Sequence, residues 1–402
     1  MPEQLWIPWP RPSGMLSYAS PRLAPALRAT LSPAAAPAWQ SIAPAWQELE
    51  NAAGADPWMS HAWCCAWWQY LGRARNLRLL YAARGTRWAA CLPLLVEPQP
   101  GLRCLTGMGG GSQTRPLLLR PGSGATEMAA LASALVHERD WDLVRLDSLP
   151  YAQAEMLARS FRDAGLRVAG GDVVRQRYLP LSGDWPEIAA LGNRATVARL
   201  PRRERALRAL GTLTCDVISA PAEAQLVFED CLKVEASGWK GRQGTAILCS
   251  PERTRFYRAL IPLLAEQRRL RLLRLTCGGA LIAFYLTAAN GAALAGLKLG
   301  FDEAWKKHSP GALMVLFTLR HAHQAGFREF NFLGGDDAFK ADWTPCYREL
   351  TSLRIFNRTL RGRAVFVVNR LRHALHGSHY GSLRRIGHSA GSSPEVSSPG
   401  VL

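Results

Sequence analysis

The sequence predicts a mixed α/β protein, with helices packed on mixed sheets, in which one order of elements occurs twice. Its 402 residues exceed what a single hydrophobic core usually organises, and they suit two cores. Apolar strands that begin at Arg78 and Arg271 run to glycine turns at Gly85 and Gly278, and both pairs stand 193 positions apart. Each half is therefore expected to have its own central sheet and to contain a helix, a hairpin, a strand, a helix and a strand.

A second correspondence lies farther along each half. Pro121-Gly122 and Pro310-Gly311 each precede a helix that leads to a strand, and these pairs stand 189 positions apart. The two correspondences predict a domain boundary near residue 183. We therefore expect four segments, of which the outer two are rich in small residues and proline: a disordered start at 1–38, domains at 39–183 and 184–376, and a disordered tail at 377–402.

Hydrophobic periodicity and turn residues predict the elements of each half. The first half is expected to contain a helix at 61–71, strands at 77–83 and 87–96, a glycine-rich loop at 107–111, a helix at 125–138, a strand at 142–148, a helix at 152–164 and a strand at 173–181. Ser60 is the N-cap of the first helix. In the second half, the elements are helices at 194–210, 222–237 and 252–268, strands at 271–276, 280–289 and 292–300, a helix at 310–325, strands at 328–333 and 349–357, and a basic helix at 363–376.

The stretch from Gly278 to Leu297 contains no charged residue, and its 20 residues would suffice to span a bilayer. However, Asn290-Gly291 lies inside this stretch and is a strong hairpin signal. Two strands of a buried sheet therefore explain the stretch better than a membrane helix does, and we expect no transmembrane segment.

The chain carries a net charge of +18, and nearly all of its basic residues are arginines. This charge favours anionic partners, such as the phosphates of a donor substrate, nucleic acid or a membrane surface, although no base-reading motif occurs. The nine cysteines are odd in number and include no C-x-x-C pair, which disfavours a disulfide framework and a zinc site. Because the N-terminus is also unlike a signal peptide, we expect a cytoplasmic protein without a metal.

The segment 331–343 is the first candidate site. A predicted strand ends in two glycines, and Asp336, Asp337, Lys340 and Trp343 follow. Open sheets bind ligands at strand ends, and neighbouring carboxylates beside a lysine can tune each other for acid–base work. The alternative is an ordinary solvated turn, which composition alone favours. As a catalytic site, this loop is expected to face a cleft between the two domains.

Two more segments could bind ligands. Ser309-Pro310-Gly311 begins a helix, and helix starts attract phosphate; the alternative is a well-made helix start without a ligand. Trp239 and Lys240 follow Glu235 in a glycine-punctuated loop, where they could form the wall of a substrate pocket or simply pack among basic residues. The short motifs of serine hydrolases, P-loop proteins and zinc proteases do not occur in the sequence.

The segment from Arg194 to Arg208 holds six arginines and one glutamate. Its apolar residues are spaced as on one helix face, and Pro201 predicts a break into two short helices. A solvated face is the ordinary interpretation of such a segment. Contact with an anion or a membrane is the alternative.

The C-terminal half resembles the BioF2-like or CelD-like acetyltransferase domain of the GNAT superfamily, a relative of the FemAB-type double-GNAT proteins. The similarity rests on these motifs: Trp239-Lys240-Gly241, Gly244-Thr245, Phe301-Asp302, Ser309-Pro310-Gly311, Gly335-Asp336, Phe339-Lys340 and Trp343. The family commonly has Tyr-Lys where this chain has Phe339-Lys340, which keeps the lysine and removes a hydroxyl. The first half is similar to the family's first copy, through a tryptophan-rich helix with Trp63, Trp67 and Trp68 and through the Leu-Pro-Leu strand Leu92–Leu94.

The resemblance implies tandem GNAT-like domains, with the active site in the second domain. It implies transfer of an acyl group from acyl-CoA to an amine or hydroxyl of a small-molecule, glycan or lipid-linked acceptor, as in envelope or exopolysaccharide synthesis. Ser309, Gly311 and Lys298 would hold the donor, although the common pyrophosphate signature Arg/Gln-x-x-Gly-x-Gly/Ala is missing.

The resemblance also suggests roles for the other candidate residues. Asp336 or Asp337 would be the base that deprotonates the acceptor, with Glu235 as a reserve. Lys340 would position the acceptor or an intermediate. The remaining candidates would bind substrate, namely Trp239, Lys240 and Trp343.

Two other functions remain open at this point. FemAB relatives use aminoacyl-tRNA as the donor, and the basic charge of this chain would suit that substrate as well. A binding protein that kept the fold and lost the chemistry is the second alternative.

Overall fold

The computed structural model describes residues 27–34, 38–72, 76–108 and 116–375. Most of the two segments that we expected to be disordered, 1–38 and 377–402, lies outside these residues, as does most of the glycine-rich loop at 107–111. The expectation is wrong for residues 27–34, which form a strand, β1, paired with the first hairpin.

Every helix and strand that the sequence predicts has a counterpart in the structure, and several elements were not expected. The first half contains β1 (Leu27–Ala34), α1 (Ala38–Ala53), a 3₁₀ helix η1 (Pro57–Met59), α2 (His61–Tyr70), β2 (Leu77–Arg84), β3 (Arg87–Gln99), β4 (Leu102–Gly107), β5 (Leu118–Leu119), α3 (Ala125–His137), β6 (Leu143–Pro150), α4 (Tyr151–Asp163) and β7 (Arg167–Pro180).

The second half follows with more helix than the first. Its elements are α5 (Trp185–Ala190), α6 (Arg194–Arg208), β8 (Leu213–Ile218), α7 (Pro221–Ser237), α8 (Trp239–Arg242), η2 (Ile247–Cys249), α9 (Pro251–Glu266), β9 (Leu270–Cys277), β10 (Ala280–Asn290), β11 (Ala293–Phe301), η3 (Glu303–His308), α10 (Pro310–Gln324), β12 (Glu329–Asn331), α11 (Ala338–Ala341), β13 (Tyr347–Phe356) and α12 (Leu360–Leu375). One prediction is corrected here, because α6 is a single helix that accommodates Pro201.

The strand order repeats in the two halves. The first half runs β1-β2-β3-β4-β6 and the second runs β8-β9-β10-β11-β12, and the last pair of each series is parallel while the other neighbours are antiparallel. A helix connects the two parallel strands in each series, α3 in the first and α10 in the second. The bounds of β2 and β9 also stand 193 positions apart at both ends, as the sequence predicted.

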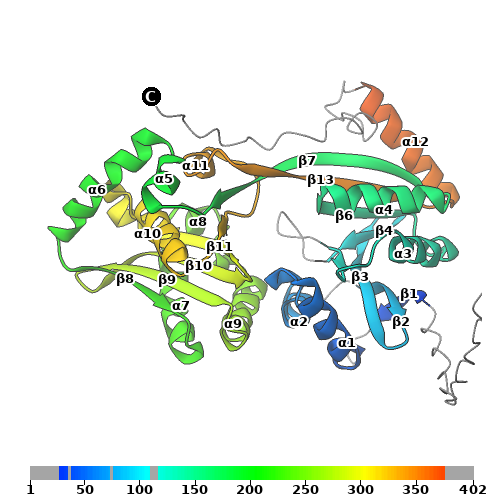
Figure 1. Ribbon diagram of the computed structural model, residues 1–402, viewed down its shortest axis with the longest axis horizontal. Helices are drawn as coiled ribbons and strands as arrows, with labels where there is room; N and C mark the ends of the chain where they lie inside the picture. The colour runs from blue at the N-terminus through cyan, green and yellow to red at the C-terminus, as the bar shows by residue number, and fades with distance from the viewer. Residues whose placement is uncertain (1–26, 35–37, 73–75, 109–115, 376–402) are drawn as a thin grey trace, which may run out of the picture.

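The two halves exchange their last strands. β7 pairs with β13 through most of its length, and its final residues, Tyr178–Pro180, pair with β12 of the second half. β13 in turn pairs with β6 of the first half. One continuous path of strands therefore crosses the molecule, with β7 and β13 spanning both halves (Figure 1). The expectation of two separate sheets is wrong, and the domain bounds at 39–183 and 184–376 stay a prediction.

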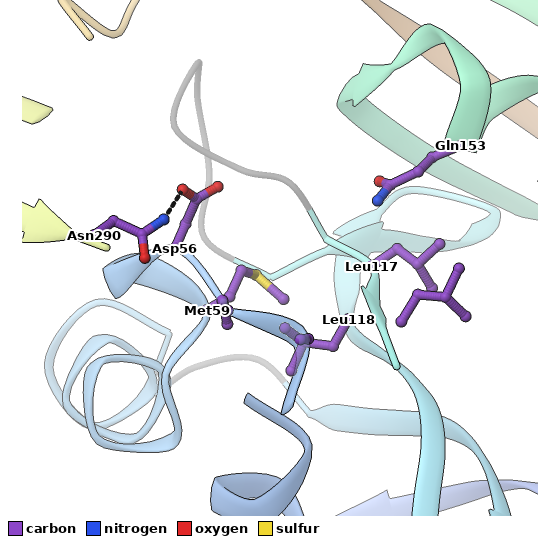
Figure 2. Close-up of a pocket in the computed structure, with 10 residues that line it drawn as sticks. Asp56, Met59, Leu117, Leu118, Gln153 and Asn290 are labelled. Carbon is purple, nitrogen blue, oxygen red and sulfur yellow. Dashed lines mark hydrogen bonds between the residues drawn. The ribbon is translucent and has the colours of Figure 1, made fainter. Parts of the chain in front are cut away.

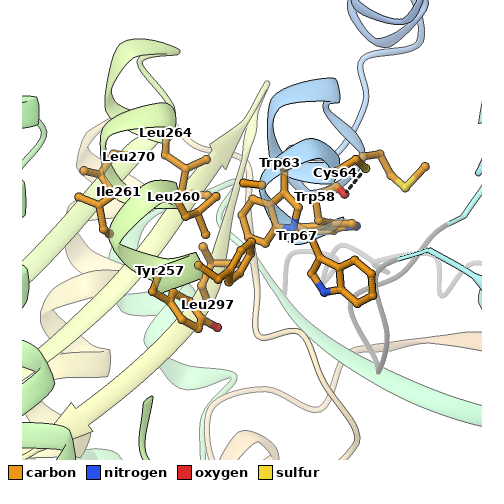
Figure 3. Packing of buried hydrophobic residues seen from close by; sticks show 14 of the residues in the cluster. Trp58, Trp63, Cys64, Trp67, Tyr257, Leu260, Ile261, Leu264, Leu270 and Leu297 are labelled. Carbon is orange, nitrogen blue, oxygen red and sulfur yellow. Dashed lines mark hydrogen bonds between the residues drawn. The ribbon is translucent and has the colours of Figure 1, made fainter. Parts of the chain in front are cut away.

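The halves also share a hydrophobic core. Helix α2 of the first half packs against α9 of the second, and the rings of Trp63 and Phe256 meet edge to face with centroids 5.8 Å apart (Figure 3). The same cluster continues through Tyr257 to Leu297 on β11. Apolar burial of this kind fixes the two halves against each other.

A polar contact lies beside this core. The side chain of Asn290, at the tip of the β10–β11 hairpin, donates from Nδ2 to Oδ1 of Asp56 over 2.7 Å (Figure 2). A cavity of about 160 Å³ opens next to the pair, between the hairpin tip and Leu117–Leu119 of the first half. The Asn-Gly hairpin signal is thus confirmed, and its asparagine also joins the halves.

The uncharged stretch from Gly278 to Leu297 is strand, as predicted. β9 and β10 turn at Gly278 and Gly279, and β10 and β11 turn at Gly291 and Ala292, directly after Asn290. Within the described parts of the chain, no helix is both long enough and apolar enough to cross a membrane.

Candidate active site

The parallel pair β11–β12 separates early. The strands pair only over Ala293–Ala295 and Glu329–Asn331, after which β11 continues to Phe301 and β12 ends. The chain leaves β12 through Leu333 and Gly334, whose φ angles of 52° and 68° are left-handed. A left-handed leucine is strained by about 1 kcal/mol or more, and such strain gathers at functional sites.

A pocket of about 680 Å³ occupies the opening between the two strands. Concave sites of this size that mix apolar walls with a few polar groups are typical of small-molecule binding. Its walls come from α8, β10, β11, the chain after β12 and α11: Trp239, Lys240, Tyr285, Gly296, Leu297, Lys298, Leu299, Phe301, Phe332, Leu333, Gly334, Asp337, Ala338, Phe339 and Lys340. All of these residues belong to the second half, so the expectation that the site faces a cleft between the halves is wrong.

A β-bulge lies in the pocket wall. Along β10–β11, Leu286 is opposite Lys298 and the next residue, Thr287, is opposite Gly296, so that Leu297 is an extra residue without a cross-strand partner. Bulges release backbone groups from the ladder and occur beside active sites. Because β12 has already ended at this point, the far edge of β11 lacks a paired strand as well.

The Glu235 carboxylate anchors Lys240. Glu235 is buried, and its Oε2 accepts from the backbone N–H of Ile247 over 2.9 Å while its Oε1 accepts from Lys240 Nζ over 3.1 Å. Lys240 also donates to the carbonyl of Leu299 over 2.9 Å, on the open part of β11. Since Glu235 is buried and does not line the pocket, its geometry suits a support for Lys240 better than a base.

Lys298 brings a second ammonium group to the pocket wall. Burial lowers the pKa of Lys298, the nearby Glu235 carboxylate opposes that change, and the positive charges of Lys240 and Arg253 add to it. Its Nζ lies 5.6 Å from the centroid of the Tyr257 ring. A partly desolvated cation in an apolar pocket can stabilise negative charge on a bound carbonyl or phosphate oxygen.

The two aspartates of the candidate loop have different surroundings. Asp336 forms an ion pair with Arg177 of β7 and does not line the pocket. Asp337 does line it, caps α11 by accepting from the N–H of Lys340 over 3.0 Å, and forms an ion pair with Lys340 Nζ at 2.9 Å. Lys340 also donates to the Gly335 carbonyl over 2.7 Å, which closes the loop on itself.

The start of α10 lies on the other side of Phe301. Ser309 has a left-handed φ of 55° and its side chain does not cap the helix. Pro310 and Gly311 are buried, and a Cβ atom at Gly311 would lie 3.0 Å from Phe301 Cδ1. Ser309 and Gly311 are therefore near the pocket through Phe301 but are not among the residues that line it.

The two candidate tryptophans lie in different surroundings. Trp239 is 46% exposed and lines the pocket, whereas Trp343 is buried in the core cluster under α10 and is absent from the pocket wall. The sequence argument missed Tyr285, whose ring lies against Gly296 so closely that a Cβ there would come within 2.2 Å of its hydroxyl. A glycine inside a strand marks such close approaches, and Gly296 was the available signal.

Among the residues that the structure describes, no three His, Cys, Asp or Glu side chains gather in a way that could hold a metal ion. The cysteines are free thiols in the structure, and most of them are buried.

Comparison with known proteins finds a similar sequence family and similar folds. Residues 194–341 match the family described as the acetyltransferase (GNAT) domain. The structure of FemX is similar at a TM-score of 0.53 and 11% identity, over 77% of this chain and 94% of FemX. Two more structures are more distant. L-PGS from Bacillus licheniformis has a TM-score of 0.45 and 15% identity, over 74% of this chain and 88% of L-PGS. A tandem GNAT protein from the clavulanic acid biosynthesis pathway has a TM-score of 0.43 and 17% identity, over 82% of this chain and 98% of that protein. None of the curated proteins matches this sequence.

Residues 194–341 of the second half thus match a GNAT domain, and the pocket at the separation of β11 and β12 is lined by residues within this match. The chain as a whole has a fold similar to that of FemX, which agrees with the FemAB-type fold that the sequence resemblance implied. The narrower likeness to BioF2-like and CelD-like domains stays a prediction.

Proposed function

We propose that this protein is an acyltransferase that moves an acyl group from acyl-CoA to an amine or hydroxyl acceptor. The observation that carries the proposal is the pocket between β11 and β12, which opens inside the matched GNAT domain beside the bulge at Leu297. The acceptor would be a small molecule, a glycan or a lipid-linked intermediate, as in envelope or exopolysaccharide synthesis, and the reaction would take place in the cytoplasm.

The donor would supply a thioester carbonyl to this pocket. The unpaired edge of β11 around Leu297 offers backbone groups that can bind a carbonyl oxygen, and Lys298 adds positive charge. Lys306 and Lys307 before α10 would attract the donor's phosphates. The buried start of α10 fits a phosphate less well, because Gly311 packs on Phe301.

The acceptor has to lose a proton as it attacks. Asp337 is the carboxylate that lines the pocket, and we propose it as the base. Lys340 holds Asp337 in place through the ion pair at 2.9 Å. Trp239 and Lys240 would contact the acceptor from the opposite wall, whereas the buried Trp343 would support the loop from the core.

Ligand retention and thermal stability test the donor. Native mass spectrometry of the purified protein would identify a bound acyl-CoA, and acetyl-CoA at 100 times its dissociation constant would stabilise the fold by about 2.7 kcal/mol. The Lys306→Gln/Lys307→Gln variant should lose part of that shift. Lys233→Gln, an exposed lysine of α7, is the control and should keep it. Ligand binding without turnover of any acceptor would favour the non-catalytic alternative.

Aminoacyl-tRNA is the second candidate donor, and the surface of α6 favours it. The arginines of α6 are exposed, and Arg203 reaches across to η3, where its Nη1 donates to the Lys307 carbonyl over 2.6 Å. An exposed basic surface beside Lys306 and Lys307 suits the RNA backbone. Two results together would make aminoacyl-tRNA the donor instead of acyl-CoA. They are binding of aminoacyl-tRNA that weakens steeply with salt, and no change of melting temperature with acetyl-CoA.

A further inference from the structure

Helix α12 carries apolar side chains on its outer face. Leu360 is 85% exposed, and Val367, Val368 and Leu371 are 51%, 48% and 57% exposed. Positions 360, 364, 367 and 371 follow the spacing of one helix face, so these side chains and Ala364 form a single stripe, which we call the α12 stripe. Large apolar side chains gathered in this way mark an interaction surface.

Arginines border the α12 stripe on both sides. Arg363 and Arg370 are seven positions apart and share one border, and Arg361 and Arg372 are eleven positions apart and share the other. All four are exposed, and the sequence of α12 contains no acidic residue. This order of basic, apolar and basic strips is the pattern of a helix that lies in a membrane interface.

The inner face of α12 is fixed to the sheet, so the helix cannot turn its stripe inward. Phe366 packs edge to face on Phe356 with ring centroids 5.2 Å apart. Asn369 accepts from Arg354 Nη1 over 2.8 Å. A Cβ atom at Gly362 would come within 2.9 Å of the carbonyl oxygen of Asp142, the residue before β6, which shows how closely the helix start approaches the sheet.

A cavity of about 510 Å³ opens beside the α12 stripe. Two arginines and three apolar side chains line it, namely Arg167, Arg370, Phe366, Val367 and Leu371. A phospholipid phosphate and the upper part of its acyl chain require this combination of positive charge and apolar wall.

We propose that α12 docks the protein on an anionic lipid surface, with the stripe in the headgroup region and the four arginines at phosphate level. Arginines can place their charge at the interface while their stems cover apolar surface. A second copy of this chain is a poorer occupant, because pairing two such stripes would bring like-charged borders together. The inference is independent of the acyl donor and of the pocket, since α12 lies on the first half, at the end away from β8–β12 (Figure 1).

The test is binding of the full-length protein to vesicles of phosphatidylglycerol and of phosphatidylcholine. We expect partition into the anionic vesicles and at least tenfold weaker partition into the neutral ones. Val367→Gln/Leu371→Gln and Arg363→Gln/Arg370→Gln should each weaken binding to anionic vesicles roughly tenfold or more. The matched controls are Leu226→Gln, which changes an exposed leucine of α7, and Arg159→Gln/Arg162→Gln, which removes the same charge from α4; both should bind normally.

Three results would overturn the proposal. Equal binding of the stripe variant and wild type would mean that charge alone attracts the vesicle. If Arg159→Gln/Arg162→Gln weakened vesicle binding as much as Arg363→Gln/Arg370→Gln does, the binding would not depend on α12. A dimer in sedimentation that Val367→Gln/Leu371→Gln dissociates would assign the stripe to a second copy of the chain. Circular dichroism and melting curves establish that each variant is folded.

Discussion

Arg177 of β7 holds Asp336 in the loop after β12: Nε lies 2.5 Å from Oδ1, and Nη2 lies 3.2 Å from Oδ2. The third guanidinium nitrogen donates to the Thr344 carbonyl over 2.8 Å. A residue of the first half therefore fixes the candidate loop of the second. The hydrogen bond from Arg177 lowers the pKa of Asp336, so this carboxylate is a weak proton acceptor.

The two aspartates should respond differently to the same change. Asp337→Asn keeps the cap of α11 and removes the proposed base, so we expect kcat to fall by about 10²–10⁴. Asp336→Asn should instead lower the free energy of unfolding by roughly 1–3 kcal/mol and leave kcat within about tenfold, because it breaks a charged hydrogen-bonded pair. Steady-state kinetics and urea denaturation of both variants decide the matter. The reverse pattern would make Asp336 the base.

Lys298 should trade stability for function. Burial lowers the pKa of Lys298, which means that its charged form destabilises the fold. This loss of stability is fully present at pH values below the folded pKa. Stability should therefore rise as pH increases through the folded pKa toward the unfolded value of about 10.4. Lys298→Met should raise the free energy of unfolding at pH 7, lose this pH dependence and lower activity. An unchanged rate in the folded variant would remove Lys298 from the site.

Gly296 and Gly335 form a matched pair for testing the pocket wall. A Cβ atom at Gly296 would lie 2.2 Å from the Tyr285 hydroxyl, whereas one at Gly335 would have nothing within 4 Å. Gly296→Ala should therefore displace Tyr285, cost about 1–3 kcal/mol and weaken ligand binding. Gly335→Ala should be close to wild type in both measurements. Thermal melts with and without ligand measure both effects. Equal melting temperatures and ligand shifts in the two variants would show that the pocket wall adjusts to the added methyl group.

Asp142 should dominate the acid sensitivity of the first half. It is fully buried, and although burial raises its pKa, hydrogen bonds from the side chain and backbone of Arg103 and from Thr359 overcome that effect and hold it at about 2. Its contribution to stability is therefore complete above the unfolded pKa of about 3.9 and is lost as pH falls toward 2. Asp142→Asn should lose about 2–3 kcal/mol at pH 7 and much less at pH 2.5. Urea titrations at both pH values would measure this difference, and a pH-independent loss would contradict it.

Local signals made much of the fold predictable. The turns at Gly85, Gly278 and Asn290-Gly291 need left-handed or hairpin residues, and the sequence contains them at those places. Strands β1, β4, β5 and β8 and helices α1, α5, α8 and α11 escaped prediction. Residues 27–53 mix alanine and proline with few periodic apolar positions, so tertiary packing outweighs their weak local preference.

The site was predictable only in part, because local sequence does not report contacts between residues that are far apart in the chain. Asp337, Lys340 and Trp239 were found because unusual residue types cluster after a strand or a helix. The partners that decide their roles are distant in sequence. Arg177 lies 159 positions before Asp336, and no local pattern reports an ion pair over such a separation. The bulge at Leu297 likewise arises from cross-strand register, which a single strand's sequence does not encode.

The exchange of β7 and β13 has a consequence for biosynthesis. The place between β6 and β7 in the sheet is filled by β13, whose last residue, Phe356, is made 176 residues after the end of β7. At 5–20 residues per second, roughly 10–35 s pass on the ribosome while those two strand edges stay open to wrong partners. A polypeptide released before Tyr347 would retain that gap permanently, so premature termination late in translation should yield an insoluble product rather than a working half.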